Sequence, residues 1–222
     1  MKNNILLLTL LLGFFSCQTK QETQTAKENF KLQTGDILFQ DLDCGPFCEA
    51  ITKVTEGYEG NDYSHCGIVS YDSAGNCIVL EAVGKGVMAT PIEEFFNKKV
   101  KDDFITVGRL KKDYQNLIPQ SIVKAESLLG KEYDDIFDIT NDSYYCSELV
   151  YETFKDANGG KEIFKLFPMT YKDPDTNEMF PIWVDYFEKL GAPIPEGEAG
   201  LNPGGISRSP YLDIHLEKKV LW

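Results

Sequence analysis

The stretch SHCGIVSYDSAGNCIVLEAV, residues 64–83, contains the pattern that decides the fold. Two runs of mainly apolar and β-branched residues, 64–71 and 77–83, flank the segment 72–76, which is rich in turn-forming residues. Two short runs of this composition joined by such a turn predict a β-hairpin. The stretch therefore predicts a sheet in which neighbouring strands are antiparallel.

The register of this hairpin decides whether two of its polar residues meet. Successive strand residues point to opposite faces of a sheet. A register that pairs His65 with Glu81 makes them direct neighbours, and one that pairs His65 with Val83 makes His65 and Glu81 diagonal neighbours on one face. A shift by one residue separates them, and the sequence does not exclude that shift.

The rest of the chain predicts further strands and several helices. The expected strands cover 37–39 and 104–110, and the expected helices cover 46–56, 92–99, 119–129, 143–157 and 183–190. Thr90 is expected to cap the helix that begins at residue 92, and the Pro/Gly-rich stretch 191–210 is expected to wrap the surface. Strands in hairpins beside separate helices indicate the α+β class.

The N-terminal residues MKNNILLLTLLLGFFSC, 1–17, predict export from the cytoplasm. A lysine precedes the apolar stretch 5–15, which is too short for a ~30 Å hydrocarbon core, because a spanning helix needs about 20 residues. A signal peptide has this organisation. Ser16 before Cys17 also matches bacterial lipoproteins, in which the cysteine carries the lipid. Phe14 replaces the usual Leu of that motif, so an ordinary signal peptide with an incidental Cys17 is the alternative.

A tether and one domain are expected after the signal peptide. Residues 18–31 begin with a polar run typical of a tether, and residues 32–222 are expected to form the folded domain. The 222-residue chain has 22 Lys and Arg against 35 Asp and Glu, a formal net charge of −13. Nucleic acids and anionic membrane surfaces attract clustered basic residues, so this charge argues against both as partners. We expect a monomer that meets the membrane only through its lipid anchor.

Cys146 is the candidate nucleophile. It follows NDSYY, residues 141–145, which favours a helix start, so Cys146 is expected in the first turn of a helix. The partial positive charge at a helix N-terminus favours a thiolate. The free main-chain N–H groups there can stabilise an oxyanion. The alternative is a buried core cysteine on the helical stripe of Leu149 and Val150.

His65 and Glu81 are the candidate partners of that cysteine. The chain has only two histidines, and His215 has no other reactive residue type close to it in the sequence. A carboxylate beside an imidazole fixes its tautomer and stabilises the imidazolium. Taken alone, a strand histidine such as His65 is more typical of a structural residue. Glu81 lies inside an apolar run and needs a partner if it is buried.

Several motifs resemble one known family. The run YCSELV, residues 145–150, the strand start YSH, 63–65, and GDI, 35–37, are similar to the circularly permuted papain-like hydrolases of the YiiX/YaeF type. These are related to NlpC-like cell-wall peptidases and, more distantly, to lecithin:retinol acyltransferase. The similarity extends over about residues 33–210.

The resemblance implies a fold, a triad and a reaction. Family members have His, then an acidic or polar partner, then Cys, which is the order of His65, Glu81 and Cys146. It implies a papain-like α+β core, in which the nucleophile helix packs against an antiparallel sheet or open barrel. It also implies amide or ester hydrolysis through an acyl-enzyme, without metal or organic cofactor. Tyr144 and Tyr145 are expected to line the cleft or assist the oxyanion.

Together these features predict a lipid-anchored cysteine hydrolase of the bacterial envelope, facing either the periplasm or the exterior. The expected substrate is a small peptide of the cell-wall type or another acyl amide. An alternative keeps the chemistry and changes the substrate to lipid esters or N-acyl lipids. An alternative of a different class is a non-catalytic binding protein that uses the same cleft.

The remaining cysteines are not expected to form a disulfide scaffold. The register that joins His65 to Glu81 places Cys66 and Cys77 on opposite faces, which disfavours a bridge between them. Cys44 and Cys48 either form a local disulfide or lie as neighbours near a helix start. A zinc site is not expected, because the adjacent strand residues His65 and Cys66 point apart and cannot readily chelate one ion.

Overall fold

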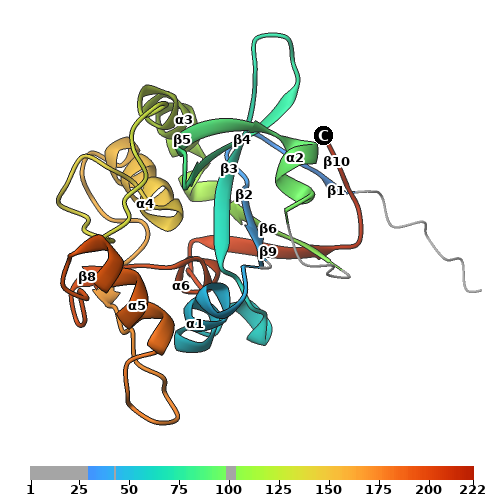
Figure 1. The fold of residues 1–222 in the computed structure, drawn as a ribbon. Coiled ribbons are helices and arrows are strands. Elements are labelled where there is room, and N and C mark those ends of the chain that lie inside the picture. The colour runs from blue at the N-terminus through green and yellow to red at the C-terminus, as the bar shows by residue number, and fades with distance from the viewer. Residues whose placement is uncertain (1–29, 43, 99–103) are drawn as a thin grey trace, which may run out of the picture.

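A six-stranded antiparallel sheet forms the centre of the computed structural model, which describes residues 30–42, 44–98 and 104–222 (Figure 1). The strand order is β5-β4-β3-β2-β6-β9, and the described sheet is open, with β5 and β9 at its edges. The strands are β2 (Ile37–Gln40), β3 (His65–Tyr71), β4 (Cys77–Val83), β5 (Gly86–Pro91), β6 (Ile105–Leu110) and β9 (Leu212–Glu217). The α+β class predicted from the sequence is confirmed.

Helices cover the two faces of this sheet unequally (Figure 1). One face carries α3 (Ile118–Ser127) and α4 (Cys146–Ala157), and the other carries α2 (Ile92–Phe96), while α5 (Pro181–Leu190) lies beside α1. The helices α1 (Pro46–Val54) and α6 (Pro203–Ser207) lie at the end of the sheet where β3 begins. The remaining elements are the 3-10 helices Tyr58–Gly60 and Lys112–Leu117, the parallel pair β1 (Phe30–Lys31) and β10 (Val220–Leu221), and the antiparallel pair β7 (Phe167–Pro168) and β8 (Ala199–Gly200).

The sheet separates two apolar cores. Between the sheet and α4 lie Phe39, Cys66 and Ile68, together with residues of α1, α3 and α5. Between the sheet and α2 lie Leu38 and Val69 with Phe95 and Val79. Neighbouring residues of β2 and β3 thus enter opposite cores, because strand side chains alternate. Both faces of these strands are buried, which explains why the sequence of β3 shows a nearly continuous apolar run.

The hairpin of β3 and β4 has a register that places His65 and Glu81 on the same face. Ile68 pairs with Leu80, and extension of this register places Gly67 opposite Glu81 and His65 diagonal to it. A Cβ at residue 67 would lie 2.5 Å from a side-chain carbon of β4 and 3.2 Å from Cβ of Glu81. Glycine therefore permits the close approach of β4 at the point where Glu81 reaches His65.

The structure differs from the sequence expectation at the start of α2. Thr90 is not a helix cap: it belongs to β5, where it pairs with Val79, and Pro91 precedes the first helical residue, Ile92. The Thr90 hydroxyl donates to the Glu81 carboxylate instead. The Thr-Pro-Ile-Glu pattern was misleading for two reasons. The strand β5 continues up to Pro91, and the Thr90 side chain points to the buried face of the sheet, where it meets the carboxylate of Glu81.

The C-terminal part is more deeply integrated than its composition predicted. Leu201 and Ile206 are buried within the stretch 191–210, which was expected only to wrap the surface, and α6 packs against α4. The strand β9 was not predicted. It pairs with β6 along its whole length and includes His215, whose ring centroid lies 4.6 Å from that of Phe30.

The expectations for a signal peptide, for a lipid on Cys17 and for most of the tether concern residues 1–29, which lie outside the described residues. In the part of the chain that the structure describes, no helix has the length and apolar character needed to cross a membrane.

Candidate active site

Helix α4 begins at Cys146, so this thiol lies in the first helical turn as predicted. Tyr145 precedes it with an extended backbone, and the Tyr145 N–H donates to the carboxyl of Glu148 at 3.2 Å. Ser147 Oγ donates to the main-chain oxygen of Leu201 at 2.9 Å, which fixes this turn against the C-terminal segment. Burial raises the pKa of Glu148 to about 9. The carboxyl is therefore neutral at pH 7 and adds no negative charge beside the thiol.

His65 and Glu81 form a buried pair. His65 Nε2 lies 2.5 Å from Glu81 Oε2, and both side chains are almost completely shielded from solvent. The start of β3 is fixed by Ser64, whose Oγ accepts from the N–H of Leu42 at 2.8 Å and donates to Asp41 at 3.0 Å. Because Glu81 engages Nε2, Nδ1 is the ring nitrogen that remains for the thiol of the nucleophile.

Two more side chains hold the carboxylate of Glu81. Thr90 Oγ1 donates to Oε1, and Lys98 Nζ lies 2.6 Å from the same oxygen. Burial alone would raise the pKa of Glu81, but His65, Lys98 and Thr90 outweigh burial and lower this pKa to about 2. Glu81 is therefore ionised throughout the neutral range and can stabilise a positive charge on the imidazole.

Cys146, His65 and Cys66 form one interacting group. A hydrogen bond from the Cys66 thiol contributes most to lowering the pKa of Cys146; burial opposes it, and His65 adds to the lowering. Burial would lower the pKa of His65, but hydrogen bonds with Cys146 and Glu81 raise it to about 9. Burial raises the pKa of Cys66 well above its usual range, so Cys66 stays a thiol. At neutral pH the arrangement favours a Cys146 thiolate beside a His65 imidazolium.

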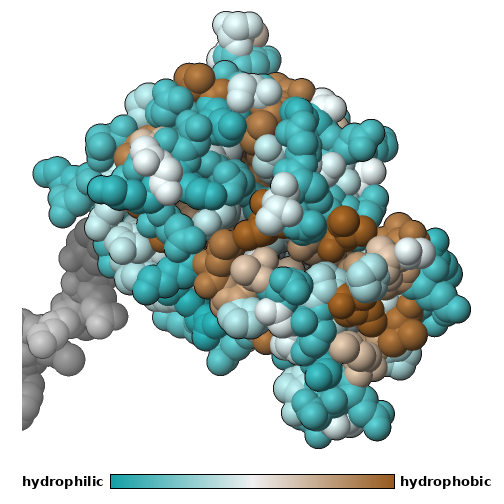
Figure 2. Space-filling view, turned by 90° about the vertical axis from the view of Figure 1, so that its left-hand side faces the viewer, coloured by the Kyte–Doolittle hydropathy of each residue, from teal (hydrophilic) through white to brown (hydrophobic). Residues whose placement is uncertain are grey.

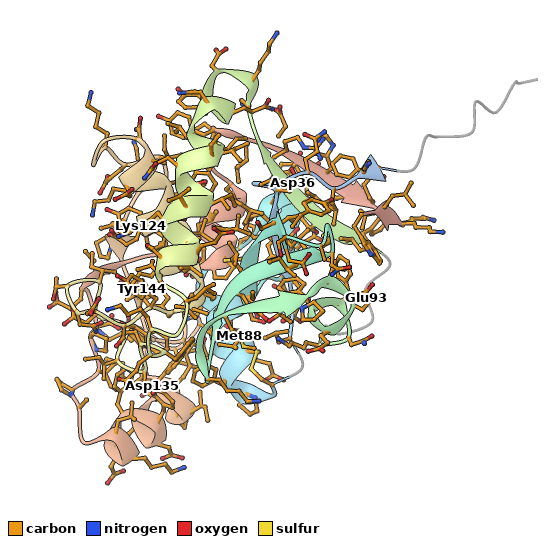
Figure 3. The ribbon with its side chains drawn as sticks, turned by 90° about the horizontal axis from the view of Figure 1, so that it is seen from above. Asp36, Met88, Glu93, Lys124, Asp135 and Tyr144 are labelled. Carbon is orange, nitrogen blue, oxygen red and sulfur yellow. A yellow bond between two sulfur atoms is a disulfide. The ribbon has the colours of Figure 1, made fainter. Side chains whose placement is uncertain are left out.

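The two tyrosines before the nucleophile have different surroundings. Tyr145 lines a pocket next to Cys146, and its hydroxyl accepts from the N–H of Leu201 at 3.3 Å. Tyr144 instead packs with Val87 and Leu128, between β5 and the end of α3 (Figure 3). Of these two tyrosines, only Tyr145 is placed to contact a substrate in that pocket.

Tyr133 lies at this pocket and was not singled out as a site residue from the sequence. Burial, with a smaller contribution from the charge of Cys146, raises the pKa of Tyr133 well above its usual range. Its phenol therefore keeps its proton and can donate a hydrogen bond near the thiol. The sequence gives no signal for this role, because nothing local to the GKEYD run, residues 130–134, shows that this loop meets the start of α4.

Gln40 and Cys66 also lie beside the candidate triad, and the sequence indicated neither of them as a site residue. Gln40 is the direct cross-strand partner of His65, it is 2% exposed, and neither polar atom of its amide has a hydrogen-bond partner in the described structure. Cys66 does point away from His65, as strand alternation predicts, but this directs it into the core that contains Cys146. The position of Gln40 beside His65 and the contact of Cys66 with Cys146 both depend on packing between segments that are distant in the chain, which the sequence does not reveal.

A pocket of about 160 Å³ lies beside Cys146. It is bounded by α1, by the first turn of α4, by Trp183 of α5 and by the segment 167–171 that includes β7. Figure 2 shows that hydrophobic residues gather in the lower half of the face on which α4 and α5 lie. The nucleophile is therefore next to a largely apolar space.

The other cysteines are placed much as the sequence indicated. Cys44 and Cys48 form a disulfide, which decides between the two alternatives left open for this pair. Cys66 and Cys77 are free and lie in different cores, in agreement with the hairpin register. Within the described ranges, His, Cys, Asp and Glu form no group of three or more that could hold a metal ion.

Comparison with known proteins gives three matches. A family model described as "Permuted papain-like amidase enzyme, YaeF/YiiX, C92 family" matches residues 31–214. "Uncharacterized protein YiiX" of Escherichia coli (strain K12) is 29% identical over 219 residues, covering 96% of this chain and 94% of that protein. A crystal structure described as metalloprotein yiiX from Escherichia coli O157:H7 has a TM-score of 0.67 and 27% identity, covering 85% of this chain and 98% of that chain.

Proposed function

Since the chain belongs to the permuted papain-like amidase family of the YaeF/YiiX type, we propose that it is a hydrolase that cleaves an amide bond with Cys146 as the nucleophile. The family match confirms the resemblance seen in the sequence, and the antiparallel sheet beside α4 agrees with the fold of that family. One observation carries the proposal: a helix-start thiol with a lowered pKa interacts with a histidine that Glu81 holds at 2.5 Å.

In the first half of the proposed reaction, the Cys146 thiolate attacks the carbonyl carbon and forms a C–S bond. The first-turn N–H groups of α4 and the phenol of Tyr133 support the developing oxyanion. The amide C–N bond then breaks, and the imidazolium of His65 gives its proton to the departing nitrogen. The products of this half are a free amine and a thioester on Cys146.

In the second half, water replaces the amine. The now neutral imidazole of His65 takes a proton from water, whose oxygen attacks the thioester carbonyl. The C–S bond breaks, a carboxylic acid leaves, and the pair of Cys146 thiolate and His65 imidazolium is restored. Glu81 keeps the ring oriented and stabilises its charge in both halves. Protein side chains and water suffice for these steps, which require no cofactor.

The proposed place of this activity is the bacterial envelope, with Cys17 as the lipid anchor. The support is the sequence 1–17, with its short apolar stretch and its small residue before the cysteine. The test is fractionation of cells that express the full chain or Cys17→Ser. We expect the full chain in the membrane fraction and the variant in the soluble fraction outside the cytoplasm. Equal recovery of both in the membrane fraction would contradict the lipid anchor.

The nucleophile is tested by trapping the acyl-enzyme. The protein is incubated with a panel of amides and matched esters, quenched in acid and mapped by peptide mass spectrometry. We expect a hydroxylamine-sensitive mass increase on the peptide that contains Cys146, and neither adduct nor turnover with Cys146→Ala. Turnover by that variant would overturn the mechanism. Ligand binding without adduct or turnover would instead support a non-catalytic binding protein.

A further inference from the structure

A second pocket lies between the segment 163–167 and the segment 205–211. Its volume is about 420 Å³, and pockets that bind small molecules measure about 300–1,000 Å³. Phe167 lines both this pocket and the one beside Cys146, but Cys146 itself lines only the first. The second pocket is therefore a separate space that shares one wall with the candidate active site.

The inner walls of the second pocket are apolar and belong to the packed core. Ile163, Phe164 and Ile206 are buried, and the ring of Phe164 meets that of Phe154 on α4 edge to face at 5.6 Å. These walls keep their positions without a ligand, so binding would not have to order them. They offer an apolar or aromatic body a preformed surface.

The mouth of the second pocket is positively charged. Arg208 and Lys165 line it with exposed side chains, and within the described ranges neither side chain has a hydrogen-bond or ion-pair partner. Several other cationic side chains of this acidic protein do form ion pairs. Lys111 adds a third positive charge nearby, since its Nζ donates to the main-chain oxygen of Pro210 at 2.7 Å. None of the described residues that line this pocket is acidic.

The main-chain oxygens along this wall are already occupied. Gly205 O accepts from the N–H of Arg208 at 3.3 Å, and Ile206 O accepts from the N–H of Ser209 at 2.9 Å. Ser209 Oγ accepts from the N–H of Tyr211 at 3.3 Å, while its own proton has no acceptor in the described structure. The polar groups left for a ligand are therefore donors: a guanidinium, an ammonium and a hydroxyl. Such a set favours an anion.

We infer that the second pocket binds a small organic anion. Its carboxylate or phosphate group lies at Arg208 and Lys165, and its apolar or aromatic body lies against Phe164 and Phe167. The planar guanidinium can hold two oxygens of such a group at once, and the ammonium adds a point charge. This inference goes beyond the proposed hydrolysis and does not depend on it.

The inference is tested by titration calorimetry of the full chain with small ligands. Phenyl phosphate and phenylacetate are expected to bind at one site per chain, and more weakly as the salt concentration rises. Phenylacetamide has the shape of phenylacetate without its charge, and inorganic phosphate lacks the ring. Each of these two is expected to bind at least about tenfold more weakly than its matched probe.

Variants with matched controls locate the ligand. Arg208→Gln and Lys165→Gln are each expected to weaken the binding of phenyl phosphate by about fivefold, because solvent partly screens these exposed charges. Lys189→Gln removes an exposed lysine of α5 that does not line the pocket, and it is expected to leave the affinity unchanged. Cys146→Ala is expected to bind phenyl phosphate like the wild type, since Cys146 lines only the other pocket.

Three results would overturn the inference. The first is equal affinity for phenylacetate and phenylacetamide, or no binding of either anionic probe. The second is an equal loss of affinity in Lys165→Gln and Lys189→Gln, which would reduce the effect to net charge. The third is loss of phenyl phosphate binding in Cys146→Ala, which would place the ligand in the candidate active site. Binding that is lost in Arg208→Gln would support the inference even if no amide acylated Cys146 and the proposed function failed.

Discussion

His65 Nε2 lies 2.5 Å from Glu81 Oε2 in a site from which solvent is almost completely excluded. Burial would lower the pKa of the imidazole, but hydrogen bonds with Cys146 and Glu81 outweigh burial and raise this pKa to about 9. Burial would raise the pKa of Glu81, but its contacts with His65, Lys98 and Thr90 lower it to about 2. The ion pair therefore stabilises the fold fully between the ordinary pKa of a glutamate and that of a histidine. This contribution is lost as the pH falls through about 2, where Glu81 takes up a proton, and as the pH rises through about 9, where His65 loses one.

Glu81→Gln is expected to lower kcat/KM by at least about 10²-fold, because the amide cannot stabilise the imidazolium as a carboxylate does. Cys146→Ala and His65→Ala are expected to cost more, since they remove the nucleophile and the proton carrier. Kinetics with any amide that the wild type turns over provide the measurement. A Glu81→Gln enzyme with wild-type kcat/KM would show that the pair is only structural.

Lys98→Met is expected to move the acidic limb of the pH–rate profile to higher pH, because loss of Lys98 raises the pKa of Glu81. Lys98 is 36% exposed, so solvent screens the pair and the loss of activity at pH 7 is expected to be only about two- to fivefold. Lys124→Met on α3 is the matched control. A shift of the same size in both variants would contradict a specific role for Lys98.

Cys66→Ala is expected to raise the pH at which the enzyme becomes active, because the Cys66 hydrogen bond contributes most to lowering the pKa of Cys146. Cys66→Ser keeps a donor and is expected to retain most of the wild-type profile. Cys77→Ala is the matched control, since Cys77 is also a free buried cysteine but lies in the other core. Coinciding pH profiles for Cys66→Ala and Cys77→Ala would exclude the proposed donor.

Gln40→Leu is expected to raise the free energy of unfolding by about 1 kcal/mol, because it removes a buried amide that has no partner in the described structure. The same change is expected to lower kcat, since the amide lies directly across from His65. Denaturant unfolding and steady-state kinetics measure the two effects. A less stable variant with unchanged kcat would contradict both expectations.

Loss of the disulfide by Cys44→Ser is expected to lower the free energy of unfolding by about 2 kcal/mol, the chain-entropy value for so short a loop. Activity under conditions where the protein is folded is expected to persist, because Cys44 and Cys48 lie outside the pairing of Cys146 with His65. Loss of turnover in a variant that is still folded would contradict this separation of stability from chemistry.

Local patterns in the sequence predicted much of the fold. The apolar runs predicted the bounds of β4 and, within one residue, those of β3. The helix-start residues before Cys146 predicted its place in the first turn of α4, although the helix was expected from residue 143 and begins at Cys146. The strand β9 was not predicted, because its partner β6 lies far earlier in the chain. Thr90 was misassigned because a Thr-Pro pattern fits a helix cap as well as a strand end.

The candidate site was predictable only in part, because some of its contacts join segments that are distant in the chain. His65, Glu81 and Cys146 could be proposed from residue type, strand parity and helix position. Cys66 and Gln40 could not, because their roles follow from the docking of α4 on β3 and from the pairing of β2 with β3. Local periodicity fixes which face a side chain takes, whereas tertiary packing fixes what that face meets.

The most direct measurement is the rate at which iodoacetamide alkylates Cys146 as a function of pH, in the wild type and in His65→Gln. The wild type is expected to react at a nearly constant rate between about pH 6 and pH 8, because the thiolate is already formed beside the imidazolium. His65→Gln is expected to react slowly there and to accelerate only at higher pH. Wild-type and variant rates that rise together toward the ordinary thiol pKa would contradict the account.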